Sequence, residues 1–150
     1  LDNDKKTNLN LLIIILGNAL GAIIVGYSLR LTRLMTNLET RAIDLVQLKL
    51  NDSWLSILIL SCFCGLLMYL AVNTFNRAKT QDIKIMALVL AITVFASIGF
   101  EHSIANIFYF SMANLWGFKS ILYVLIMLIG NGIGSLIIPF VNKLLKISNI

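Results

Sequence analysis

Uncharged apolar runs dominate this chain and alternate with short stretches that carry the charges. The runs cover residues 11–29, 53–74, 85–116 and 120–142. Because about 20 helical residues cross the hydrocarbon core of a bilayer, the first, second and fourth runs each predict one transmembrane helix. We therefore expect residues 1–150 to form a single membrane domain, an all-α, polytopic membrane helix bundle.

The third run, residues 85–116, is too long for one straight crossing, since it would form a helix of about 48 Å. Polar or small residues stand near its middle: Gly99, Glu101, His102 and Ser103. Non-helical backbone is tolerated at membrane depth where protein buries it or where it lines a cavity. We predict a broken helix, with the break near residues 99–103.

The connection between the first two runs has apolar residues at helical spacing and charges of both signs. The apolar positions are Leu31, Leu34, Met35, Leu38, Ala42, Leu45 and Val46. This pattern predicts an amphipathic helix over about residues 31–50 that lies along the outer membrane interface.

Composition supports the membrane interpretation, because 59% of the residues are hydrophobic and only 13% are charged. Soluble domains carry about 25% charged residues. The net charge of +5 comes from cations between the apolar runs, so topology explains it better than nucleic-acid binding does. Basic residues of the short loops place both ends of this segment on the cytoplasmic side of the cell (inner) membrane. They are Lys5, Lys6, Arg77, Lys79, Lys84, Lys143 and Lys146.

Enzymatic and metal chemistry find little support in the sequence. Cys62 and Cys64 are two positions apart in an apolar run and face directions about 200° apart on a helix, so we expect them to pack as small apolar residues. A single histidine cannot form a multi-histidine metal or haem site, and no nucleophile has an evident oriented base. We expect no enzymatic activity, no metal and no cofactor.

The chain contains an internal repeat, in which GNALGAIIV (residues 17–25) returns as GNGIGSLII (residues 130–138). The matched positions are Gly17 with Gly130, Asn18 with Asn131, and Gly21 with Gly134. One interpretation is an inverted-topology repeat, as in many transport proteins, because the first and fourth crossings of a chain run in opposite directions. The other is two independent small-residue packing motifs.

An inverted repeat would have a unit of three helices: the second run, the broken third run and the fourth run. Its partner unit would then need two further helices before Leu11, the second of them broken. On that interpretation we expect the chain to be the last four crossings of a six-crossing protein.

Glu101 and His102 are the only acidic or basic side chains within the four runs. A charge at the bilayer centre costs about 2.5–3.5 kcal/mol even on insertion scales, so function is the first hypothesis. The half-helix that starts near Ser103 would point unpaired N–H groups at the break, and with the imidazole these would suit a small anion. We expect Glu101 to accept hydrogen bonds from the loop. The alternative is that Glu101 and His102 are neutral and only form hydrogen bonds within a structural bend.

The sequence GFEHSIANIF (residues 99–108), the GN-x-x-G helices and LLMYLAV (residues 66–72) together resemble the formate/nitrite transporter family of monovalent-anion channels. The resemblance implies an aquaporin-like protomer, with its own pore, within a homopentamer. The implied pore residues are His102 at the centre, Glu101, Ser103 and Asn106 around it, Phe95 at an apolar constriction, and Lys49 in the vestibule. The chain departs from the family at Gly65, where an Asn is common, which affects part of the polar network.

We therefore expect a channel or transporter in the lipid bilayer for small monovalent anions of weak acids, such as formate, nitrite or hydrosulfide. His102 would act as a proton relay or as a gate. Two alternatives remain from the sequence: a small proton-coupled multidrug exporter that uses an exposed Glu101, and a non-transporting membrane scaffold.

Overall fold

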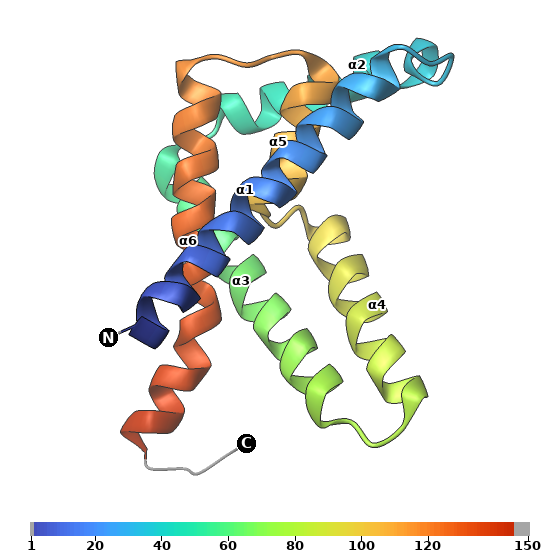
Figure 1. Ribbon diagram of the computed structural model, residues 1–150. Coiled ribbons are helices and arrows are strands. Elements are labelled where there is room, and N and C mark those ends of the chain that lie inside the picture. Colours follow the sequence, from blue (N-terminus) through green and yellow to red (C-terminus); the bar gives the residue numbers. More distant parts are fainter. Residues whose placement is uncertain (1, 146–150) are drawn as a thin grey trace. The chain divides into compact units, whose positions relative to one another are not determined.

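The computed structural model describes the backbone of residues 2–145 and the side chains of residue 7 and residues 9–145. These residues form six α-helices and no strand (Figure 1). The helices are α1 (Asp2–Arg30), α2 (Met35–Asn51), α3 (Trp54–Arg77), α4 (Gln81–Ile98), α5 (Ser103–Ala113) and α6 (Phe118–Leu144). The predicted all-α, polytopic helix bundle is confirmed.

Four helices of the described chain are long and apolar enough to cross a membrane: Leu9–Arg30, Trp54–Arg77, Gln81–Ile98 and Phe118–Leu144. Each helix extends beyond its apolar run at one end or at both, because helical hydrogen bonding continues into neighbouring polar residues. The predicted break is present, since α4 ends at Ile98 and α5 begins at Ser103. Of the basic residues used for the topology, Lys146 and the side chains of Lys5 and Lys6 lie outside the described residues.

The described residues divide into two compact units. The first unit contains residues 2–51 and 104–121, which comprise α1, α2 and nearly all of α5. The second unit contains residues 52–103 and 122–145, which comprise α3, α4, the loop after α4, and most of α6.

In the first unit, α1 packs closely on α5. A Cβ added to Gly26 would lie 2.7 Å from the Cβ of Ser111, so only glycine permits this approach. Arg30, the last residue of α1, donates from Nη1 to the carbonyl oxygen of Met112 at 2.7 Å. The predicted amphipathic helix is α2, which buries Met35, Ala42 and Val46 along one face.

In the second unit, α3 and α4 form a hairpin joined by a short loop, drawn in green and yellow in Figure 1. Ser53 caps the start of α3 by accepting a hydrogen bond from the N–H of Ser56 at 3.1 Å. Ile57 of α3 packs with Tyr123 and Met127 of α6 in a buried apolar cluster. The α3–α6 contact therefore provides the core of this unit.

Candidate functional site

The helix break in the second unit begins at Gly99, which adopts a left-handed conformation with φ of 85°. Glycine takes this conformation without the steric cost of a Cβ, which makes it the common residue after a helix. The N–H groups of Gly99 and Phe100 both donate to the carbonyl oxygen of Phe95, at 3.1 and 3.0 Å. This closes α4 and releases residues 100–102 from the helix.

The side chain of Asn131 in α6 binds the loop on both sides of His102. Its Oδ1 accepts a hydrogen bond from the N–H of Ser103 at 2.9 Å. Its Nδ2 donates to the carbonyl oxygen of Glu101 at 2.8 Å, and also to that of Ser61 in α3 at 3.0 Å. Helix ends leave backbone groups unpaired, and each such group in an apolar environment costs free energy. By binding these groups, the Asn131 amide stabilises the break and connects it to α3.

Glycine residues bring α6 close enough to α3 for these hydrogen bonds. A Cβ added to Gly130 would lie 2.6 Å from the Cβ of Ser61, and one added to Gly134 would overlap the carbonyl oxygen of Cys62. A Cβ on Gly65 would overlap the carbonyl oxygen of Asn131. Small residues at such helix contacts let two backbones approach each other. Gly130 and Gly134, the glycine frame of α6, therefore form a packing surface against α3.

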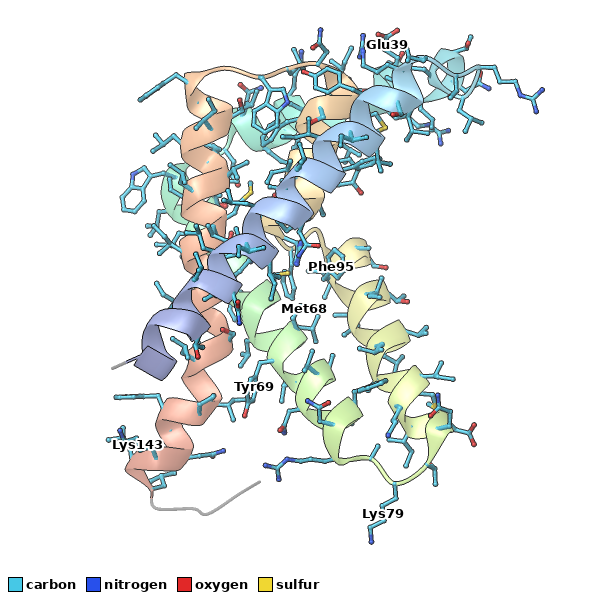
Figure 2. All side chains as sticks on the ribbon, in the orientation of Figure 1. Glu39, Met68, Tyr69, Lys79, Phe95 and Lys143 are labelled. Atoms are coloured by element: carbon cyan, nitrogen blue, oxygen red, sulfur yellow. The ribbon has the colours of Figure 1, made fainter. Side chains whose placement is uncertain are left out.

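His102 lies half-buried beside a cavity of about 300 Å³ within this unit. The lining residues are Gly65, Met68, Tyr69, Val72, His102, Asn131 and Ser135. The centroid of the imidazole is 6.0 Å from that of the Phe95 ring. Figure 2 labels Met68 and Tyr69 on α3, and Phe95 near the end of α4. The cavity thus combines apolar side chains with a few polar groups, as is usual for sites that take small molecules.

The loop that carries His102 is further held by aromatic packing and by burial. The rings of Phe63 in α3 and Phe100 stack with centroids 5.7 Å apart. Glu101 and Ser103 are each only 4% exposed. The structure therefore brings four residues predicted from the sequence into one unit with Asn131: Phe95, Glu101, His102 and Ser103.

Two other predicted pore residues belong to the first unit. Asn106 is 2% exposed within α5, and Lys49 is half-buried near the end of α2. Their roles beside His102 stay predictions.

The matching glycines of α1, Gly17 and Gly21, do not lie against another helix in the way that those of α6 do. Gly17, Asn18 and Gly21 are exposed, and a Cβ added to either glycine would meet no described atom within 4 Å. The equivalence of Asn18 and Asn131 in an inverted repeat stays a prediction.

Asn131 has a larger role than the sequence suggests. The repeat and the glycine frame indicate helix packing, whereas the structure adds the hydrogen bonds to the break. The signal in the sequence is the cost of an amide side chain within an apolar helix, which requires partners. Among the described side chains, no group of three or more His, Cys, Asp or Glu could hold a metal ion.

Comparison with known protein families finds that the model of the formate/nitrite transporter family matches residues 5–144. Comparisons with curated proteins and with solved structures gave no match. The aligned region includes the helix break, His102 and Asn131.

Proposed function

Because the chain belongs to the formate/nitrite transporter family, we propose that it conducts small monovalent anions of weak acids, such as formate, nitrite or hydrosulfide. Family membership and the apolar helices make it a multi-pass membrane protein of an anion-transporting class, and they favour transport over catalysis. One observation carries the finer proposal: the single histidine of the chain lies at the helix break and lines the cavity.

The chemistry of the cavity supports a role for proton transfer. Moving a bare anion through an apolar region is costly, whereas the neutral acid crosses it at a much smaller cost. Imidazole has an ordinary pKa of about 6.5, so it can donate and recover a proton near neutral pH. In this mechanism imidazolium at His102 donates a proton to the arriving anion, and the neutral acid passes Phe95 and releases that proton to water on the exit side. A hydronium ion from the entry side then restores the imidazolium. Within transport, the alternative is conduction of the bare anion with His102 as a gate.

The remaining predicted residues have supporting roles in this proposal. Lys49 attracts the anion in the vestibule, while Glu101, Ser103 and Asn106 form the polar surroundings of His102. Residues 1–150 act as one membrane domain within a homopentamer in the cell (inner) membrane.

Both ends of the segment are cytoplasmic in this proposal. In support of that orientation, Lys79 after α3 and Lys143 near the end of α6 lie at the same end of the second unit (Figure 2). Cytoplasmic loops carry an excess of such cations.

The two alternatives fit the structure less well. A proton-coupled multidrug exporter that uses Glu101 needs this carboxyl group exposed to its substrate, but Glu101 is buried and does not line the cavity. A scaffold without transport activity would not need a titratable side chain in a cavity, and a charged group at membrane depth is costly.

The test is uptake of formate, nitrite and hydrosulfide by liposomes that contain the purified protein, between about pH 5 and pH 8. His102→Phe should assemble like the wild type and lose pH-dependent uptake. His102→Asn keeps polarity without titration, so it should conduct bare anions or nothing. A wild-type pH profile in both variants would contradict the proton-relay role. Efflux of cationic drugs instead would support the exporter, and no flux of either kind would support the scaffold.

A further inference from the structure

The two backbone groups that Asn131 binds in the loop belong to the residues on either side of His102. The carbonyl oxygen of Glu101 precedes the histidine and the N–H of Ser103 follows it, and the two hydrogen bonds measure 2.8 and 2.9 Å. A side chain that holds both neighbours of a residue restricts the backbone from which that residue projects. Asn131 therefore fixes where the imidazole of His102 can lie.

The same amide also connects the loop to the packed core of the second unit. Its Nδ2 group donates to the carbonyl oxygen of Ser61, a residue of α3 that is fully buried. Gly65 and Gly130 keep α3 and α6 in close approach at this level. The position of His102 therefore depends on the packing of α3 against α6 as well as on the loop.

We propose that Asn131 is a positioning residue that holds His102 in the cavity, and that transport depends on Asn131 through His102. This inference rests on the proposed function. It goes beyond helix packing, since a packing role requires no hydrogen bond to the loop. An apolar residue of similar size could fill the same space.

An amide is required here because the site needs a donor group and an acceptor in one short side chain. An amide provides two N–H donors and one carbonyl acceptor, whereas a carboxylate is only an acceptor. Asn131→Asp keeps the shape of the side chain, but it places a carboxylate oxygen against the carbonyl oxygens of Ser61 and Glu101. The acceptor for Ser103 would remain while the two other hydrogen bonds would be lost.

Other titratable groups lie around His102. From α3, Tyr69 lines the same cavity, and Cys64 is buried nearby in the same helix. Glu101 adjoins His102 in the loop. The parts of α4 and α6 beside His102 contribute Phe95, Asn131 and Ser135, which do not titrate in the physiological range. Asn131→Asp adds a carboxyl group to this set, so Asn131→Gln is a useful second variant.

The flux experiment compares wild type, Asn131→Asp, His102→Asn and the double variant in the full-length protein, with formate as the probe. Asn131→Asp should lower formate uptake by about tenfold or more and flatten its pH profile, as expected for the loss of two buried hydrogen bonds. Where His102→Asn still conducts formate, Asn131→Asp in that background should change uptake by less than about twofold, because the histidine that Asn131 positions is absent. Where His102→Asn conducts nothing, the imidazole signal described below decides. An equal loss in both backgrounds would overturn the proposal.

Two further variants separate positioning from misfolding. Asn142→Asp makes the same substitution elsewhere in α6, and uptake should stay within about twofold of the wild type. Asn131→Gln keeps the donors and the acceptor but lengthens the side chain, so it should give an intermediate loss. Wild-type uptake in Asn131→Asp would refute the inference.

An NMR measurement tests whether Asn131 positions the His102 side chain, without a measurement of transport. In protein labelled with ¹⁵N-histidine, the imidazole signal of His102 is the one that is missing from the spectrum of His102→Asn. Asn131→Asp should shift or broaden that imidazole signal, and Asn142→Asp should leave it unchanged. An unchanged signal in Asn131→Asp would overturn the inference. If His102→Asn retained the wild-type pH profile, the proposed function would fail, and this spectrum alone would decide whether Asn131 positions His102.

Discussion

Gly65 of α3 lies directly against the backbone of Asn131 in α6, and a Cβ at position 65 would overlap the carbonyl oxygen of Asn131. From the resemblance alone, Gly65 would mean only the loss of a polar group at this position. The structure gives it a positive role, because its missing side chain allows α6 to approach α3. That approach brings the amide of Asn131 to Ser61 and to the helix break.

Replacement of this glycine should separate the two helices. We expect Gly65→Ala to lower the free energy of unfolding by about 1–3 kcal/mol, the usual cost of overpacking a tight contact. It should also lower formate uptake, because the hydrogen bonds of Asn131 would lengthen. Thermal unfolding of the detergent-solubilised protein and uptake into liposomes would measure the two effects.

Gly132→Ala is the matched control, since a Cβ on Gly132 would meet no described atom within 4 Å. This variant should be as stable as the wild type or slightly more stable, because alanine favours the helix more than glycine does. Equal stability of the two variants would contradict a tight contact at Gly65.

Much of the fold follows from the sequence, because it depends on local pattern. Hydrophobic runs predict the helices that can cross a membrane, and the polar centre of the third run predicts the break between Ile98 and Ser103. The helix ends are less predictable. Helix α4 begins at Gln81, four residues before the apolar run, because polar residues also continue a helix.

The hydrogen bonds of Asn131 could not be predicted, because its partners lie far away in the sequence. Ser61 is 70 residues from Asn131 and Glu101 is 30 residues away. A sequence pattern shows that a buried amide needs partners, but only tertiary packing selects them. The glycine frame likewise predicts a close helix contact without identifying α3 as the other helix.

The end of α1 offers a second prediction, within the first unit. Arg30 donates to the carbonyl oxygen of Met112 near the end of α5, and its other nitrogen, Nη2, lies 3.5 Å from Oε1 of Glu39. A cation is favourable at the carboxyl end of a helix, where carbonyl groups lack partners. Arg30→Ala should therefore lower the free energy of unfolding by about 1.5–3 kcal/mol, measured by thermal or denaturant unfolding in detergent.

Glu39→Ala removes the other contact of Arg30 and serves as the comparison. Glu39 is largely exposed, and exposed ion pairs contribute less than about 1 kcal/mol. This variant should change stability by less than that amount. If Glu39→Ala were as destabilising as Arg30→Ala, the ion pair and not the helix end would be the important contact.

Phe95 lies beside His102, so its ring should keep water and bare anions away from the imidazole. We expect Phe95→Ala to raise leakage of chloride into liposomes and to weaken the pH dependence of formate uptake, because anions could then pass without a proton. Phe140→Ala is the control, since Phe140 of α6 is 61% exposed and does not line the cavity. Equal chloride leakage in the two variants would contradict a constriction at Phe95.

The cavity itself should be the route that the anion takes through the protein. Val72 lines the cavity from α3 and is 47% exposed, so a larger side chain there can be accommodated without disturbing the buried core. Val72→Trp should fill part of the cavity and lower formate uptake by about tenfold or more, while thermal unfolding stays near the wild-type value. Val141→Trp introduces the same ring at an exposed position of α6 that does not line the cavity, and its uptake should match the wild type. Undiminished uptake in Val72→Trp would mean that the anion does not pass through this cavity.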